Sequence, residues 1–262
     1  MKDNRMNHSL NIPSLRSQVS DAEWLARVDL AACYRLVAQF GWDDLVYTHI
    51  SMRVPGEADH FLINPYGLFF DEITASSLIK VDHACQPLHA TDFPVNPAGF
   101  IIHSAVHEGR PDVACVLHTH TLHGVAVSAQ KDGLLPISQH SLFPLTQLRY
   151  HDYEGVAVRE GEKSRLVADL GDGNCMVLRN HGLLTCGRSV AEAFQNMYFL
   201  EAACRIQVLA QGGGATLLKV PQAIQDEIPA MARAATRSQG ADQLVWPGLL
   251  RRLDRRNPGY DQ

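Results

Sequence analysis

Apolar residues recur every three or four positions in three long stretches of the 262-residue chain, which is the spacing of a helix with one buried face. The first stretch follows Ser20, where Glu23 stands three residues later as in a capping box, and it ends at Gly41. The second spans Pro97 to Glu108; the third begins with another such box and spans Val190 to about Gln211. Shorter helices are expected at residues 74–81, 121–129 and 221–237.

Short apolar runs bounded by turn residues lie between these stretches and predict strands. YTHISMRV and HFLINPYG, within residues 47–67, indicate an antiparallel pair. VACVL, at residues 113–117, predicts a buried strand, and LLPISQHSLF, YHDYEGVAV and NCMVLRNHG resemble further strands and loops. Because strands and helices are mixed along the chain, the expected fold class is α/β: a three-layer α/β/α sandwich with a mixed, largely antiparallel central sheet.

The organisation expected from the sequence is a single domain. No internal repeat, low-complexity tract or change of composition marks a boundary. Residues 1–19 are polar and irregular, and we expect a flexible N-terminal arm there. Residues 20–262 would then form one domain, whose C-terminal tail, from about residue 216 to 262, packs on the domain itself or on a neighbouring subunit.

Composition and charge exclude several classes of partner. Hydrophobic residues make up 46% and charged residues 19%, as in a globular protein with a sizeable core. A net charge of -5 and the absence of a long basic run argue against nucleic acid. No apolar run approaches the roughly 20 residues that span a bilayer, and the N-terminus lacks the apolar core of a signal peptide. Six scattered cysteines fit reduced thiols, so a cytoplasmic location without a membrane partner is expected.

Histidines follow the predicted strand VACVL directly. His118 and His120 alternate, so on an extended chain they point to the same side, about 6.5 to 7 Å apart. They could hold a metal ion, or they could be polar residues that bond to the backbone at a strand end. A second apolar run, CMVLRN, also ends in a histidine, His181. Three imidazoles with an open position are typical of a catalytic metal site.

The motifs together resemble the class II aldolase/adducin family. VNPAGFIIHSAVHEGRPDVACVLHTHT, VLRNHGLLTCG and AEAFQNMYFLEAACRIQVLA carry the resemblance, and HISMRV, FLINPYG and TASSLIKVD match the N-terminal half. The likeness covers roughly residues 22–215. It implies an α/β/α sandwich, usually a cyclic homotetramer with active sites near subunit boundaries. It also implies a small-molecule substrate and a divalent metal held by His118, His120 and His181.

The chain departs from the sugar-phosphate aldolases of the family at three places. Gly99, about 19 residues before His118, replaces a glutamate that works there as acid/base. Thr48 and His49 replace a Gly-Asn pair that helps to cradle phosphate, and Pro97-Ala98 replaces a Ser-Ser pair near the missing glutamate. Since phosphate needs such backbone and hydroxyl donors, these changes favour a non-phosphorylated substrate. They resemble the adducin-like branch, whose animal members are cytoskeletal proteins.

Other polar residues are candidates for the site. His140 falls near the position of a catalytic tyrosine of the family. Because Gly99 replaces the usual acid, His140, His49 or a metal-bound water is expected to move protons, although each histidine could instead be structural. His123 is expected to be structural, and His103 and His107 are expected to pack in the core. Weaker candidates for a pocket, each with a structural alternative, are Asp71, Glu72, the cluster 150–153 and Tyr260.

The function expected from these features is that of a divalent-metal-dependent lyase of aldolase or decarboxylase type, which forms an enediolate from a small oxygenated carbonyl or carboxylate compound. Zinc is the expected ion, with manganese or iron(II) as alternatives, because ligand type alone does not choose between them. Two other functions stay open. The same three histidines could serve a non-haem iron oxygenase, or the protein could be a non-catalytic, adducin-like scaffold.

Overall fold

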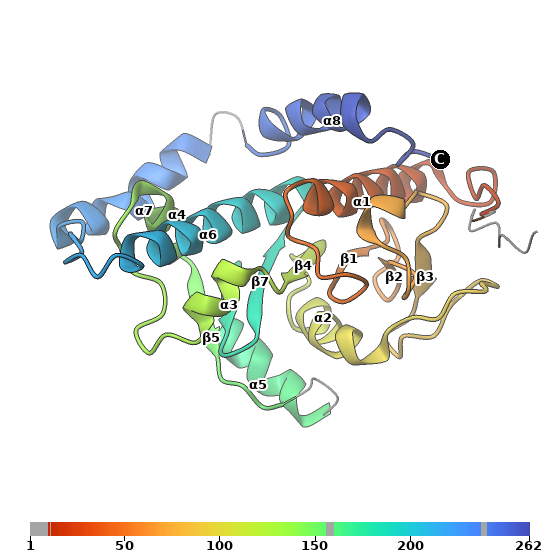
Figure 1. The fold of residues 1–262 in the computed structure, drawn as a ribbon. Helices are drawn as coiled ribbons and strands as arrows, with labels where there is room; N and C mark the ends of the chain where they lie inside the picture. Colours follow the sequence, from red (N-terminus) through yellow and green to blue (C-terminus); the bar gives the residue numbers. More distant parts are fainter. Residues whose placement is uncertain (1–9, 11, 156–159, 237–239) are drawn as a thin grey trace, which may run out of the picture.

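A mixed seven-stranded sheet forms the middle layer of the molecule (Figure 1). The computed structural model describes residues 10, 12–155, 160–236 and 240–262. The strand order is β3-β2-β1-β4-β7-β6-β5, and every neighbouring pair is antiparallel except β5 and β6, which are parallel. The strands are β1 (His49–Arg53), β2 (Phe61–Ile63), β3 (Ile79–Val81), β4 (Cys115–Thr119), β5 (Leu148–His151), β6 (Cys175–Leu178) and β7 (Gly182–Gly187).

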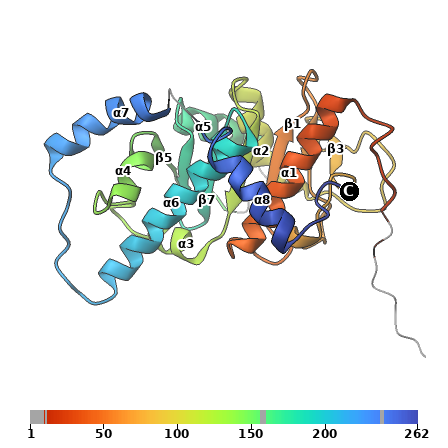
Figure 2. The same cartoon turned by 90° about the horizontal axis from the view of Figure 1, so that it is seen from above.

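Helices cover both faces of the sheet. Their bounds are α1 (Asp21–Gln39), α2 (Pro97–Gly109), α3 (Leu122–Ser128), α4 (Gln139–Leu145), α5 (Glu160–Leu170), α6 (Val190–Gln211), α7 (Gln222–Thr236) and α8 (Val245–Arg256), with a 3-10 turn η1 (Phe70–Glu72). In Figure 1 α1 and α6 lie above the sheet, and α2 and α5 lie below it. Figure 2 shows α8 lying over α1 and α6. No described helix is long and apolar enough to cross a membrane.

Alternating side chains of the central strands pack into two separate hydrophobic cores, one on each face of the sheet. On β4, Cys115 and Leu117 pack with residues of α1 and α6, whereas Val116 packs with residues of α2 and α5. This period of two is what a sheet buried on both faces requires. The predicted three-layer α/β/α sandwich with a largely antiparallel sheet is therefore confirmed.

The two longest predicted helices are also confirmed. The hydroxyl of Ser20 accepts from the backbone N–H of Glu23 at 3.1 Å, and Ser189 does the same for Glu192. The return half of the predicted capping box forms in neither case: the Glu23 carboxylate accepts from Arg27 and Lys80, and the Glu192 carboxylate accepts from the backbone N–H of Arg188. The hydroxyl cap and the apolar stripe alone therefore suffice to begin α1.

Two predictions of local structure are wrong. No helix forms at 74–81, because the hydroxyls of Thr74 and Ser77 bond to each other's backbone N–H and close a turn, after which β3 pairs with β2. The second half of LLPISQHSLF is helical, as α4, because Ser138 caps it by accepting from the backbone N–H of Ser141. Helices α5 and α8 were not predicted; α8 carries the apolar residues of the tail against α1.

The end of the chain packs against its own domain. The backbone N–H groups of Ala75 and Ser76 donate to the carbonyl oxygens of Tyr260 and Gln262. Tyr260 is 8% exposed, and its hydroxyl donates to Asp254, so this side chain belongs to its own core rather than to a neighbouring site. Of the expected N-terminal arm, residues 1–9 and 11 lie outside the described residues.

Candidate metal centre

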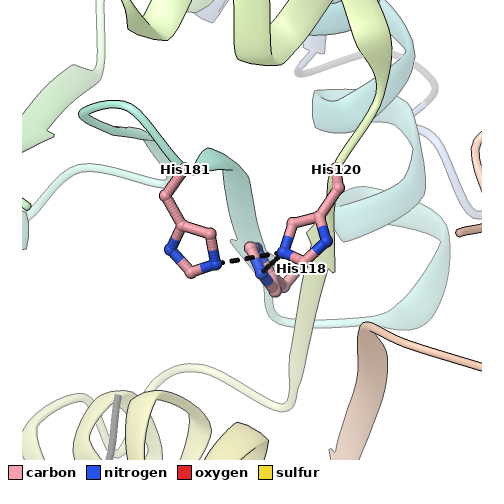
Figure 3. A group of neighbouring side chains, drawn as sticks. All are labelled: His118, His120 and His181. Atoms are coloured by element: carbon pink, nitrogen blue, oxygen red, sulfur yellow. Dashed lines mark hydrogen bonds between the residues drawn. The ribbon is translucent and has the colours of Figure 1, made fainter. Parts of the chain in front are cut away.

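Three histidines converge at one edge of the sheet (Figure 3). His118 is on β4, His120 follows the end of that strand, and His181 is in the turn between β6 and β7. The Nε2 atom of His120 lies 3.0 Å from Nε2 of His118 and 3.0 Å from Nε2 of His181. All three ligand atoms lie within 4.8 Å of one another. The structure thus brings together the three residues that the sequence predicted as metal ligands.

Strand pairing explains the convergence. β4 and β7 are antiparallel neighbours, with His118 opposite Leu184, so the turn before β7 returns beside the end of β4. Asn180 adopts a positive φ of 56° in this turn, a conformation that asparagine tolerates better than most residues. Gly182 follows His181 where a Cβ would collide with the Thr119 carbonyl oxygen and touch the rings of both other histidines. A glycine is therefore required for the turn to approach.

The outer ring nitrogens of two histidines are held by fixed acceptors. Nδ1–H of His118 donates to the carbonyl oxygen of Leu183 at 2.9 Å, and Nδ1–H of His120 donates to the carboxylate of Asp44 at 3.0 Å. Each neutral ring therefore presents a lone pair at Nε2, and two lone pairs face each other across 3.0 Å. Such an arrangement is repulsive unless a cation lies between the nitrogens. The donor set consequently fits a divalent metal with imidazole ligands and outer-shell acceptors.

Burial lowers the pKa of two of these imidazoles, His118 and His181. The pKa of His118 lies well below its ordinary value because of burial, with smaller effects of His181, His120 and His49. Burial, with a contribution from His120, lowers the pKa of His181 to about 4. Neutral imidazoles are the form that binds a metal ion, so the pair is ready to bind at neutral pH.

A row of further buried histidines continues from the three-histidine cluster into the protein. His49 stands opposite His118 in the β1–β4 pair, with ring centroids 6.0 Å apart, and its ring lies 4.0 Å from that of His103. Ser51 then links His103 and His107, at 2.7 and 2.8 Å from their ring nitrogens. Burial lowers the pKa of His103 well below its ordinary value, and that of His107 to about 3. His103 and His107 pack in the core, as expected, while His49 borders the cluster.

The remaining sequence candidates lie elsewhere. His140 is at the start of α4, and its ring packs against Phe199 of α6, 5.9 Å away, rather than on the three histidines. His123 has a structural partner, as expected, because its Nδ1–H donates to the buried Glu201 at 2.8 Å. Tyr153 is half exposed, with its ring 6.4 Å from that of His181. Asp71 and Glu72 lie in the 3-10 turn η1.

Sequence reasoning missed Asp44, which the structure places on His120. The carboxylate is 76 positions away in sequence and lies in the loop before β1, where Leu45 and Thr48 have positive φ angles. The available signal was the Asp43-Asp44 pair just ahead of a predicted strand. Asp44 reaches the site only because β1 pairs with β4, and no local pattern in the sequence indicates this pairing.

Sequence comparison finds relatives over most of the chain. The sequence model described as "Class II Aldolase and Adducin N-terminal domain" matches residues 28–208. A Pseudomonas aeruginosa protein named as a candidate class 2 aldolase is 59% identical over 259 residues, which cover 97% of this chain and 98% of that protein. Alpha-adducin of Rattus norvegicus is 49% identical over 197 residues, which cover 73% of this chain but 27% of the adducin.

Solved structures show the same fold. An aldolase II superfamily protein from Pseudomonas syringae matches with a TM-score of 0.88 at 48% identity, covering 95% of this chain and 100% of that one. An L-fuculose 1-phosphate aldolase from Glaciozyma antarctica matches with a TM-score of 0.75 at 25% identity, covering 94% of each chain. These matches confirm the resemblance that the motifs predicted.

Proposed function

Because the chain belongs to the class II aldolase and adducin family, we propose that it is a divalent-metal-dependent lyase acting on a small, non-phosphorylated carbonyl or carboxylate compound. The observation that carries this proposal is the convergence of three Nε2 atoms from His118, His120 and His181. In this proposal those histidines hold the ion, zinc being the expected one. When bound, the ion would supply a Lewis acid that polarises a substrate carbonyl and stabilises an enediolate.

The protein's own residues define what surrounds the ion. Leu183 and Asp44 fix the planes of His118 and His120 through their Nδ1–H groups, so two of the three lone pairs have a set direction. Gly99 offers no carboxylate, so another group must move the proton. His49 is the residue we propose for this role, because it borders His118 and its ring is held between the cluster and His103.

The proposed substrate class rests on the residues that replace the phosphate-binding Gly-Asn pair of the sugar-phosphate aldolases. The L-fuculose 1-phosphate aldolase with the same fold is named for a phosphorylated sugar. In this chain Thr48 and His49 stand where sugar-phosphate aldolases have Gly-Asn, and the side chain of His49 is buried with its ring 4.0 Å from that of His103. We therefore propose a substrate without phosphate, with enediolate chemistry of aldol or decarboxylation type. His140 stays a proposed acid/base residue of second rank, since it lies against Phe199.

A second candidate function is that of a non-catalytic binding protein of the adducin kind. The 49% identity to alpha-adducin over 197 residues supports it, as does the missing carboxylate at Gly99. The adducin is much longer than this chain, which matches 27% of it. A role of this kind would leave the three histidines without a catalytic function.

Metal analysis combined with proton exchange separates the two functions. Purified protein should contain about one equivalent of metal, and in D₂O it should exchange the C–H protons of dihydroxyacetone or hydroxypyruvate, followed by NMR. We expect His118→Ala to lose metal and exchange, and His123→Asn, in the same segment but outside the cluster, to keep both. Substrate consumption that stops when oxygen is removed would favour the iron oxygenase. Protein without stoichiometric metal, in which His118→Ala behaves as wild type, would favour the binding protein.

A further inference from the structure

His181 differs from the other two cluster histidines in the surroundings of its Nδ1 atom, the ring nitrogen that faces away from the cluster. His118 and His120 each donate Nδ1–H to a fixed acceptor, Leu183 and Asp44 respectively. In Figure 3 the outer ring nitrogen of His181 points away from the other two histidines. Within the described part of the chain, no acceptor is hydrogen-bonded to it. One of three converging imidazoles therefore lacks the contact that orients the others.

A small cavity lies beside His181 and is lined also by Glu162, His151 and Tyr153. Its volume is about 10 Å³, which is about the space for the centre of one water molecule. Polar side chains on several sides of the cavity offer such a water the partners that it needs. The cavity is too small for a substrate, but it can hold a water molecule that bridges two protein groups.

Glu162 is the group in this cavity that needs a donor. It lies on α5, its residue is 5% exposed, and within the described residues its Oε2 atom has no hydrogen-bond partner. The other oxygen, Oε1, lies 3.6 Å from Nε2 of His151, beyond hydrogen-bond distance. His151 is itself held by Asp169, which accepts its Nδ1–H at 2.7 Å. A buried carboxylate oxygen without a donor is costly, and such groups in native proteins call for a specific explanation.

We propose that Glu162 orients His181 through one water molecule in this cavity, and that it is thereby a positioning residue for the third metal ligand. The water accepts Nδ1–H of His181 and donates to Oε2 of Glu162. The carboxylate then has its donor, and all three imidazoles present Nε2 in a fixed direction. A carboxylate behind a ligating histidine also raises the basicity of the ring. The inference rests on the proposed function, because it takes His181 to be a metal ligand.

Titration of metal-free protein with Co²⁺ against a chelator of known affinity tests this role. Co²⁺ is the probe because its visible absorption reports the geometry of its ligands. We expect Glu162→Gln to weaken binding roughly 10-fold and Glu162→Met roughly 100-fold, with a shifted absorption spectrum in both. Glu154→Gln is the matched control, because Glu154 lines the same cavity but its carboxylate already accepts from Arg165. Its affinity and spectrum should equal those of the wild type.

Urea unfolding of the same metal-free variants distinguishes positioning from packing. Removal of a buried carboxylate oxygen that has no protein partner should leave the metal-free protein equally stable or more stable, while metal affinity falls. Wild-type affinity and spectrum in both Glu162 variants overturn the inference. So does an affinity loss that only accompanies loss of metal-free folding. Wild-type protein that takes up no metal overturns the proposed function itself and this inference with it, which is a separate result.

Discussion

His49 of β1 and His118 of β4 face each other across an antiparallel strand pair, with ring centroids 6.0 Å apart. His118 is a member of the converging cluster, whereas His49 turns its ring onto His103, 4.0 Å away. The sheet therefore places a buried imidazole that is not part of the cluster directly beside one that is. This relationship makes the roles of the two residues separable by experiment.

Substitution of His49 should affect turnover without affecting the metal. We expect His49→Gln to retain the metal content of the wild type and to lower proton exchange by roughly 10²- to 10⁴-fold, the usual contribution of an acid/base group. Metal analysis and NMR exchange in D₂O measure the two quantities on the same sample. Loss of metal in this variant would show that His49 supports the ligands instead, and unchanged exchange would remove it from the chemistry.

Asp44→Asn should weaken metal binding while the fold persists. The carboxylate accepts Nδ1–H of His120 at 3.0 Å, and outer-shell partners of this kind contribute roughly 10- to 100-fold to affinity. We expect a loss of about 10-fold, because an amide oxygen can still accept the hydrogen bond. Chelator competition measures it. Asp43→Asn, a change at the preceding carboxylate, serves as the control, and equal affinities of the two variants would contradict the prediction.

Gly182→Ala should damage both the sheet and the cluster. The added Cβ would collide with the backbone oxygen of Thr119 and lie 3.2 and 3.4 Å from the rings of His120 and His118. Because backbone cannot yield as a flexible side chain can, we expect a loss of about 1 to 3 kcal/mol in the free energy of unfolding, together with loss of metal. Urea denaturation and metal analysis test this. Gly213→Ala, where nothing lies within 4 Å of the added Cβ, is the matched control.

As the pH falls, the metal-free protein should begin to lose stability at a pH above the range in which most carboxylates titrate. Burial depresses the pKa of His103, and lowers that of His107 to about 3, whereas an unfolded histidine titrates near 6.5. The unfolded chain therefore binds more protons below about pH 6.5, and stability falls as pH drops from there towards the folded values. The slope should be up to about 1.4 kcal/mol per pH unit for each histidine.

Urea midpoints at several pH values between 5 and 7.5 give this slope. His107→Gln, which can keep a hydrogen bond to Ser51, should flatten it by about one histidine's share. His60→Gln is the control, since His60 is partly exposed, with its ring against Glu57. Equal slopes in wild type and His107→Gln would show that His107 is not the neutral buried group described above.

The parts of the fold predicted from sequence are those with local causes. α1 and α6 are long, and each has a hydroxyl cap and an apolar stripe within its own residues. The sequence predicts a helix where the turn at 74–77 lies, because the hydroxyls that close this turn are also good helix caps. The sequence does not predict α8, because its apolar residues pack against α1, which lies more than 200 positions earlier in the chain.

The candidate site divides in the same way. His118 and His120 could be paired from spacing alone, since alternate residues of a strand share a side. His181 is suggested by a second strand-like run that ends in a histidine, and the resemblance to a family supports it, but its approach depends on β4 pairing with β7. Glu162 carries no local signal, and the only local signal at Asp44 is its position in an acidic pair ahead of a predicted strand. Each is an ordinary acidic residue until the sheet closes and places it beside an imidazole.

The pairing of β4 with β7 also sets the order in which the molecule can mature. It joins residues 64 or more positions apart, and contacts of this range form late because the intervening loop must be closed first. Before that step the nascent chain can present only the neighbouring pair His118 and His120. Binding of an ion that requires all three histidines would therefore follow completion of the sheet centre, and refolding should show a lag between helix formation and metal binding.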